Sequence, residues 1–151
     1  MRILALSLFF FLYAFTAYAQ MEKPVEWSFE TKKVDNGVYD VYFKADINGN
    51  WYVYSQHLDG QSGPIPTAFA FEQMDGCKLI GDVEEIGNPI SKFDDMFSME
   101  LKYYRGNVTF RQRIELDSEA AYTTGHLTFM TCNNDKCMPP TDIDFSFDLA
   151  K

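Results

Sequence analysis

Two cysteines separated by four residues, Cys132 and Cys137, could carry thiol–disulfide chemistry. The residues before Cys132 alternate between apolar and polar as in a β-strand, and the intervening Asn-Asn-Asp-Lys suits a turn. Pro139 and Pro140 then end regular strand pairing. The spacing therefore predicts a short hairpin in which the cysteines face each other. Opposite residues of antiparallel strands have Cα atoms about 4.5–5.5 Å apart, within reach of a disulfide.

Two interpretations of such a bond remain open. As a structural staple it closes a short loop, which contributes only about 2 kcal/mol in the chain-entropy treatment. A chain in which Phe, Tyr and Trp make up 17% of the residues can bury a core without it. A redox role, in which the bond opens and closes by exchange with other thiols, is the interpretation we favour. Lys136 favours the thiolate whereas Asp135 and the negative net charge oppose it, so we expect reaction mainly with a docked partner.

The N-terminal residues 1–19 fit a secretory signal peptide. Arg2 precedes a nearly unbroken apolar run over residues 3–15, and Ala17-Tyr18-Ala19 fits the small-x-small cleavage pattern. The run is shorter than the ~20 residues of a transmembrane helix. We therefore predict cleavage and a single mature domain over residues 20–151, with an uncleaved membrane anchor as the alternative. Export would place the cysteines in a compartment where disulfides persist.

The overall charge and the third cysteine add two expectations. The chain has 13 basic and 22 acidic residues and a net charge of −9 at pH 7. Nucleic acid and anionic lipid are poor partners for such a chain, because their phosphates would be repelled. Cys77 follows Asp75-Gly76 at the start of a predicted strand, and we expect it to be a buried or semi-buried free thiol without a function. A bond from Cys77 to either of the paired cysteines would overturn the redox interpretation.

Alternation with a period of two residues dominates the rest of the chain. It is strongest over residues 39–47, 108–116 and 143–149. Turn sequences such as Asn-Gly and Asp-Gly separate the segments, and no window has a convincing helical repeat. These features predict an all-β fold, an immunoglobulin-like antiparallel β-sandwich, with irregular stretches at residues 58–66 and 88–97. Further strands are expected around residues 27–29, 51–55, 67–71, 78–83, 99–104 and 126–132.

Four segments relate the chain to a known family. They are Trp51-Tyr52-Val53-Tyr54-Ser55-Gln56, Gly63-Pro64-Ile65-Pro66-Thr67, Asp94-Asp95-Met96-Phe97 with Tyr104-Arg105-Gly106, and Cys132 with Cys137-Met138-Pro139-Pro140. Through them residues 24–149 resemble the periplasmic N-terminal domain of the thiol:disulfide interchange protein DsbD, in a stand-alone form. The last segment is the most specific, because two spaced cysteines that end in Cys-x-Pro-Pro at the close of an all-β domain are uncommon.

The resemblance implies an immunoglobulin-like periplasmic domain that exchanges thiols and disulfides without a cofactor. Its electrons would come from a membrane thiol transporter and pass to periplasmic thioredoxin-like oxidoreductases or isomerases, in processes such as cytochrome c biogenesis. The transmembrane and thioredoxin-like domains of the family are absent here, so the donor would be a separate chain. The best-known members have five residues between the cysteines, whereas this chain has four.

The same resemblance implies roles for individual residues. Cys137 would form mixed disulfides with partners, and Cys132 would resolve them. Phe97 would be the aromatic tip of a cap loop that shields the cysteines, with Asp95 and Met96 beside it. A lid makes physical sense because a reduced dithiol in an oxidising compartment needs protection from the wrong oxidants, and a docking partner can displace a single ring.

Two tyrosines would line the site beside the cysteines. They are Tyr52 and Tyr54, which alternate with Trp51 and Val53. Successive side chains of a strand point to opposite faces. At least one face of this segment must therefore belong to the buried core, whatever the function.

Two further classes of function fit the sequence. The first is a secreted immunoglobulin-like binding module in which the disulfide is a passive clamp on a recognition loop. The second is a copper-handling protein, in which His126, Met130 and Met138 join the cysteine pair as soft ligands for Cu(I). No second cluster of cysteine and histidine accompanies them, so we expect an ordinary strand histidine and no metal site.

Overall fold

The structure is a computed structural model that describes residues 23–58, 63–95 and 97–150. The predicted signal peptide at residues 1–19 and the predicted cap-loop residue Met96 lie outside these ranges. In the part of the chain that is described, every named element is a β-strand, and no helix is long and apolar enough to cross a membrane. The strands are β1 (Val25–Asp35), β2 (Val38–Ile47), β3 (Tyr52–Tyr54), β4 (Ala68–Asp75), β5 (Cys77–Ile86), β6 (Ile90–Asp94), β7 (Met99–Tyr104), β8 (Gly106–Leu116), β9 (Ala120–Phe129), β10 (Thr131–Cys132) and β11 (Thr141–Ala150).

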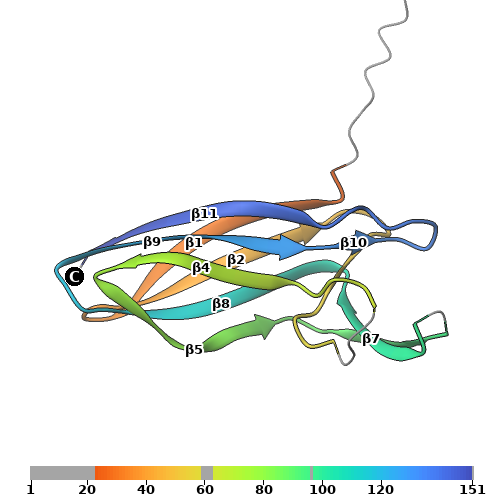
Figure 1. The fold of residues 1–151 in the computed structure, drawn as a ribbon, viewed down its shortest axis with the longest axis horizontal. Helices are drawn as coiled ribbons and strands as arrows, with labels where there is room; N and C mark the ends of the chain where they lie inside the picture. Colours follow the sequence, from red (N-terminus) through yellow and green to blue (C-terminus); the bar gives the residue numbers. More distant parts are fainter. Residues whose placement is uncertain (1–22, 59–62, 96, 151) are drawn as a thin grey trace, which may run out of the picture.

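The strands form three antiparallel sheets, two of which pack face to face as a sandwich (Figure 1). One layer has the order β1-β2-β8-β5, and the other has the order β11-β9-β4. The third sheet, β10-β3-β7-β6, lies toward the end of the molecule opposite to the C-terminus (Figure 1). This arrangement confirms the predicted all-β, immunoglobulin-like β-sandwich.

Alternation along the longest strands builds the core between the two layers. The three segments with the strongest predicted alternation are β2, β8 and β11, whose alternate residues are buried. Aromatic rings from both layers meet there, because the ring centre of Phe43 lies 4.9 Å from that of Phe145 and 4.7 Å from that of Phe69. Such pairs contribute about 0.5–1.5 kcal/mol beyond the burial of apolar area. This core is built by residues outside the disulfide hairpin.

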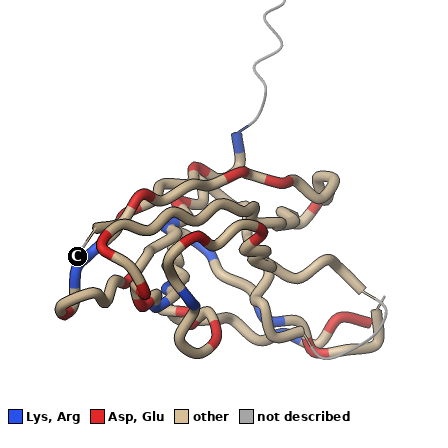
Figure 2. The backbone as a smooth tube through the Cα atoms, turned by 60° about the vertical axis from the view of Figure 1, so that its left-hand side comes forward, with Lys and Arg blue, Asp and Glu red and all other residues tan. Residues whose placement is uncertain are grey.

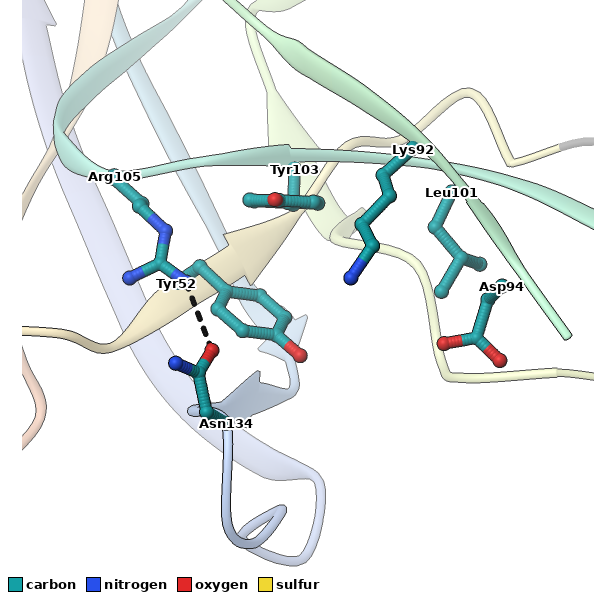
Figure 3. Close-up of a pocket in the computed structure, with 7 residues that line it drawn as sticks. All are labelled: Tyr52, Lys92, Asp94, Leu101, Tyr103, Arg105 and Asn134. Carbon is teal, nitrogen blue, oxygen red and sulfur yellow. Dashed lines mark hydrogen bonds between the residues drawn. The ribbon is translucent and has the colours of Figure 1, made fainter. Parts of the chain in front are cut away.

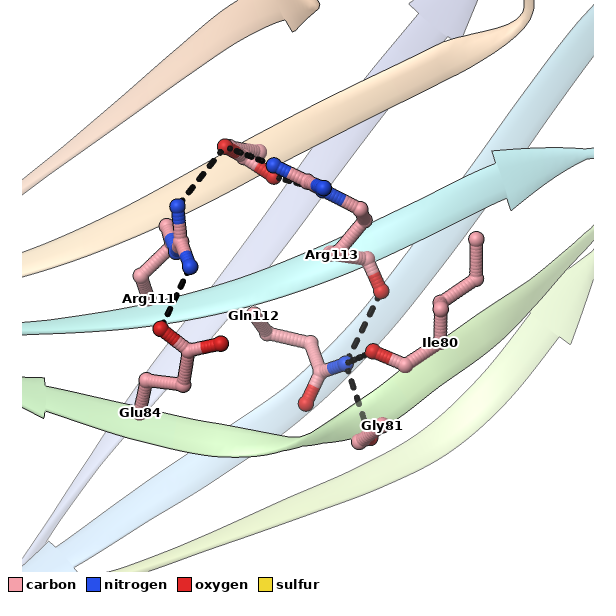
Figure 4. Close-up of polar contacts among 7 residues, drawn as sticks. Ile80, Gly81, Glu84, Arg111, Gln112 and Arg113 are labelled. Atoms are coloured by element: carbon pink, nitrogen blue, oxygen red, sulfur yellow. Dashed lines mark hydrogen bonds and ion pairs between the residues drawn. The ribbon is translucent and has the colours of Figure 1, made fainter.

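One polar residue interrupts the apolar face of β8. Gln112 is 1% exposed, and its Nε2 donates to the carbonyl oxygens of Ile80 at 3.1 Å, Gly81 at 3.2 Å and Arg113 at 2.8 Å (Figure 4). The pairing of β5 with β8 shifts register between Ile80 and Glu84, beside these carbonyls. A buried amide is tolerated here because its donors are satisfied.

An ion-pair cluster joins β2 to β8 on the outer face of the same sheet. The side chain of Asp40 is 4% exposed and accepts hydrogen bonds from Arg113 Nε at 2.7 Å and Nη2 at 3.0 Å. Arg111 lies 3.5 Å from the same carboxylate and also pairs with Glu84 (Figure 4). The hydrogen bond from Arg113 holds the pKa of Asp40 below its ordinary value, against the opposing effect of burial.

The predicted irregular stretch at residues 88–97 is wrong in part, because Ile90–Asp94 forms strand β6 and pairs with β7. Four of its five residues are exposed. Both faces of this strand lie away from the main core, so its sequence carries no alternation of apolar and polar residues. The pattern that located the core strands could not locate this one.

The excess of acidic residues is spread over the molecule. Figure 2 shows acidic positions along strands and turns throughout the described part of the backbone, with fewer basic positions between them. Some are paired, as Lys78 is with Glu115 at 3.1 Å. Exposed pairs of this kind contribute at most about 1 kcal/mol each. The distribution is that of a solvated acidic surface.

Candidate functional site at the Cys132–Cys137 disulfide

Cys132 and Cys137 form the disulfide that their spacing predicts. Cys132 ends β10, and Cys137 faces it as an isolated antiparallel bridge with Cα atoms 4.0 Å apart. The pair occupies a non-hydrogen-bonded position, the kind in which opposite residues come closest. Main-chain hydrogen bonds flank it on both sides, from Asn133 N to Lys136 O at 2.9 Å and from Met138 N to Thr131 O at 2.8 Å.

The side chain of Asn133 organises the turn between the cysteines. Its Oδ1 accepts hydrogen bonds from the main-chain nitrogens of Asp135 and Lys136, both at 2.9 Å. Asparagine commonly closes turns in this way. In addition, the Nζ of Lys136 lies 5.5 Å from the centre of the Trp51 ring. These contacts hold the hairpin by means other than the bond between the sulfurs.

The two cysteines differ sharply in exposure. Cys132 is 0% exposed, whereas Cys137 is an exposed residue. An incoming thiol can therefore reach Cys137 and not Cys132. Cys132 belongs to a second apolar cluster, separate from the sandwich core, that also contains Tyr54, Leu101, Tyr52, Leu58, Met99, Tyr103 and Met130.

Tyr54 contacts the buried sulfur directly. Its hydroxyl donates to Cys132 Sγ at 3.3 Å, and the residue as a whole is 2% exposed. Burial, followed by a hydrogen bond with Tyr52, raises the pKa of Tyr54 well above its ordinary value. The phenol is therefore a protonated donor, and a donor of this kind stabilises a thiolate more than a thiol.

The alternation predicted for residues 51–54 accounts for both faces of β3. Trp51 and Val53 belong to the sandwich core, while Tyr52 and Tyr54 face the cluster around Cys132. Tyr52 lies directly opposite Cys132 in the pairing of β3 with β10. The structure thus brings both predicted tyrosines to the buried cysteine.

The predicted cap loop is the turn between β6 and β7. The main-chain N–H of Phe97 donates to Asp94 Oδ1 at 3.1 Å, and the Ser98 hydroxyl donates to the carbonyl oxygen of Asp95 at 3.4 Å. Asp95 is exposed, and Phe97 as a residue is 38% exposed. This turn and the disulfide hairpin lie at the same end of the long axis of the molecule (Figure 1). That Phe97 covers the cysteines stays a prediction.

Several residues at the site were not predicted from the sequence. A pocket beside Tyr52 is lined by Lys92, Asp94, Leu101, Tyr103, Arg105 and Asn134 (Figure 3). The rings of Tyr52 and Tyr103 lie 4.5 Å apart. Alternation over residues 99–104 puts Leu101 and Tyr103 on one face, but only the pairing of β7 with β3 shows which face meets the disulfide. Arg105 belongs to one of the family-like segments, which was the available signal.

The third cysteine and the strand histidine lie apart from this site. Cys77 is free and buried, as expected, and burial, followed by the charges of Asp117 and Asp75, raises its pKa. His126 Nδ1 lies 3.1 Å from Glu72 Oε1. No group of three or more His, Cys, Asp or Glu side chains in the described ranges could hold a metal ion.

Fold and site together define an immunoglobulin-like domain that carries a half-exposed disulfide on a hairpin at one end. Residues 19–149 match the family described as "Thiol:disulfide interchange protein DsbD, N-terminal", so the chain belongs to this family. The family expected from the sequence is thereby confirmed. No curated protein matches the chain.

Several solved structures are similar to this chain, among them the following three. The N-terminal periplasmic domain of ScsB from Proteus mirabilis shares 18% identity with a TM-score of 0.57, over 85% of this chain and 47% of that one. The reduced DsbD N-terminal domain of Neisseria meningitidis shares 17% identity with a TM-score of 0.46, over 83% and 86% of the two chains. A chain in the structure of the complex between the DsbD and PilB N-terminal domains from the same organism shares 18% identity with a TM-score of 0.46. The match covers 80% of this chain and 80% of that chain. This chain thus spans about half the length of the ScsB chain, and at this identity the similarity concerns the fold.

Proposed function

We propose that this protein relays reducing equivalents by thiol–disulfide exchange through Cys132 and Cys137. The observation that carries the proposal is the asymmetry of the pair: Cys137 is exposed, while Cys132 is 0% exposed beneath a hydroxyl donor. A structural disulfide does not require that one sulfur be exposed to attack while a hydrogen-bond donor stabilises the other as a leaving thiolate. Membership of a family named for thiol:disulfide interchange supports the same function.

Reduction of the protein begins at the exposed sulfur. A donor thiolate attacks Cys137 Sγ, the bond between the cysteines breaks, and Cys132 leaves as a thiolate that accepts the Tyr54 hydrogen bond at 3.3 Å. A second donor thiol then attacks the donor sulfur of the mixed disulfide, which releases Cys137. The donor becomes a disulfide, and the protein holds two thiols that carry its two electrons and two protons.

Oxidation runs the same steps toward an acceptor. The Cys137 thiolate attacks the disulfide of a partner and forms a mixed disulfide, and the first partner thiolate leaves. Cys132 then attacks Cys137 Sγ, which restores the Cys132–Cys137 bond and releases the second partner thiolate. Both electrons end on the partner. Cys137 is thus the attacking residue and Cys132 the resolving residue.

The proposed relay has a location and a set of partners. Residues 1–19 would be a cleaved signal peptide that exports the domain of residues 20–151 to the periplasm. The donor would be a membrane thiol transporter. The acceptors would be thioredoxin-like oxidoreductases or isomerases, including those of cytochrome c biogenesis. The cap loop with Asp95, Met96 and Phe97 would shield the reduced pair until a partner docks.

Thiol counting tests the two cysteine roles in a Cys77→Ala background, which leaves only the pair to titrate. The reduced protein is mixed with dithiobis(nitrobenzoate), an aromatic disulfide that releases a coloured thiolate. The parent should release two aromatic thiolates per molecule. Cys132→Ala should release only one, because the other aromatic thiol stays bound to Cys137 as a mixed disulfide. If Cys137→Ala instead holds the stable mixed disulfide, the roles are reversed.

The reduction potential tests the relay against the binding-module alternative. A structural disulfide lies below about −300 mV, whereas a bond that exchanges with cellular thiols lies above this value. We expect the Cys132–Cys137 couple to lie above it when equilibrated with glutathione or dithiothreitol buffers. A value below it would show a passive clamp and refute the relay.

A further inference from the structure

Arg105 occupies a junction between the disulfide hairpin and the rest of the site. It follows the last residue of β7 and precedes Gly106, whose φ of +74° makes the sharp turn into β8. Its side chain extends along the pocket beside Tyr52 toward Asn134 (Figure 3). Asn134 lies inside the turn that connects Cys132 to Cys137.

The guanidinium group of Arg105 contacts four residues that come from three stretches of the chain. Nη1 donates to the carbonyl oxygen of Asn50 at 2.6 Å, and Nη2 donates to Asn134 Oδ1 at 3.5 Å. The Cζ atom lies 5.1 Å from the centre of the Tyr52 ring and 5.7 Å from that of the Tyr103 ring. A planar group with fixed donors is suited to hold several elements in one arrangement.

These contacts join the two parts of the site that hold the two sulfurs. Tyr52 lies opposite Cys132 in the strand pairing, so Arg105 is anchored beside the buried cysteine. Asn134 is part of the turn that carries the exposed Cys137. Arg105 therefore spans from the buried side of the redox pair to its exposed side.

We propose that Arg105 is a positioning residue that keeps the hairpin closed when the disulfide is open. Once the bond is reduced, only non-covalent contacts keep Cys137 within reach of Cys132. A pair held close reacts as if at high local concentration, which favours the resolving step and the oxidised form. This inference rests on the proposed exchange and adds the residue that makes its second step fast.

A purely electrostatic role for Arg105 predicts different results. A cation near the pair would stabilise the Cys137 thiolate and so accelerate the first attack. Its removal would slow the first step and lower the reduction potential, because the reduced form would lose stabilisation. Positioning predicts the opposite change in potential, with the effect confined to the second step.

The experiment follows both thiolates released from dithiobis(nitrobenzoate) by rapid mixing, in the Cys77→Ala background. With Arg105→Gln we expect an unchanged first phase and a second phase slowed about fivefold, the effect of roughly 1 kcal/mol. The potential should rise by about 20 mV, since tenfold in this equilibrium is 29.6 mV. Arg105→Lys, which keeps the charge but not the fork, should also slow the second phase.

Two further variants provide a second test of the contact and a matched control. Asn134→Ala removes the hairpin end of the contact at an exposed turn residue, and it should slow the second phase in the same direction. Lys102→Gln removes a cation from the other face of β7 and should leave both phases unchanged. If Arg105→Gln and Asn134→Ala release the second thiolate as fast as the parent does, the inference is wrong. If the parent itself releases only one thiolate per molecule, the exchange function has failed instead.

Discussion

Replacing Tyr54 with phenylalanine would remove a single hydroxyl from the sulfur of Cys132. Tyr54 is 2% exposed, and phenylalanine fills nearly the same volume, so no sizeable cavity forms. The substitution removes the 3.3 Å hydrogen bond from the phenol to Sγ and leaves the ring packing in place. Because Cys132 leaves as a thiolate when the disulfide is reduced, we expect reductive opening to slow in Tyr54→Phe.

The size of the effect follows from the change in charge on sulfur. A hydrogen bond to a neutral group contributes about 0.5–1.5 kcal/mol, and one to a charged group about 1.5–3 kcal/mol. The charge on Cys132 develops as the bond breaks, so the difference of about 1 kcal/mol acts on the transition state and slows the reaction about fivefold. Burial raises the pKa of Tyr54, so the ratio of the two rates should not change across neutral and mildly alkaline pH.

The assay is the rate of reduction by dithiothreitol at several thiol concentrations, followed by the fluorescence of the tryptophan residues. Trp51 is a suitable reporter because its ring packs near Lys136 in the hairpin. Tyr103→Phe is the matched control, since it removes a phenol from the same aromatic cluster and should change the rate less than about twofold. Equal rates for Tyr54→Phe and the wild type would refute the role of the hydroxyl, as would an equal slowing in both variants.

Two further predictions concern the cap and the fold. Phe97→Ala should speed oxidation of the reduced protein by the neutral hydroxyethyl disulfide, because the ring would no longer shield Cys137. Phe93→Ala, at a 60% exposed position in the same hairpin, should leave this rate unchanged. An unchanged rate for Phe97→Ala would show that Phe97 does not act as a lid. Asp40→Asn should lower the free energy of unfolding at neutral pH by about 1–2 kcal/mol, less than a fully buried pair because Arg113 is 38% exposed. Since the pKa of Asp40 is lowered on folding, this stabilisation is present above its unfolded value of about 3.9 and is lost as the pH falls through the folded value. Urea unfolding should therefore show that the free energy of unfolding decreases more between neutral and acid pH in the wild type than in Asp40→Asn. Asp46→Asn, on the same strand, should behave as the wild type.

The sequence predicted the elements whose environment differs between their two faces. Strand β2 is buried on one side and solvated on the other, and so are β8 and β11, which makes their residues alternate. Strand β6 has no buried face, and it was predicted as irregular for that reason. Gln112 interrupts the apolar residues of β8, and the interrupted pairing of β5 supplies the carbonyl oxygens that satisfy its amide.

The disulfide pair itself could be identified from the sequence because its geometry is local. Four turn-forming residues between Cys132 and Cys137 allow the two sulfurs to meet across a short hairpin. The positions of the two predicted tyrosines followed partly from the same pattern. Alternation places Tyr52 and Tyr54 on one face of a strand, but it does not show what that face meets.

The difference between the two sulfurs was decided only by the tertiary structure. Cys132 is buried because β3 and β7, which are distant in sequence, pack Tyr54 and Leu101 around it, while Cys137 lies beyond that cluster. The contacts of Arg105 with Asn50 and Asn134 depend on the same pairing. Composition and spacing specify which atoms can react, but solvent exposure and hydrogen bonding depend on residues brought together from across the chain. These long-range contacts assign a separate role to each cysteine.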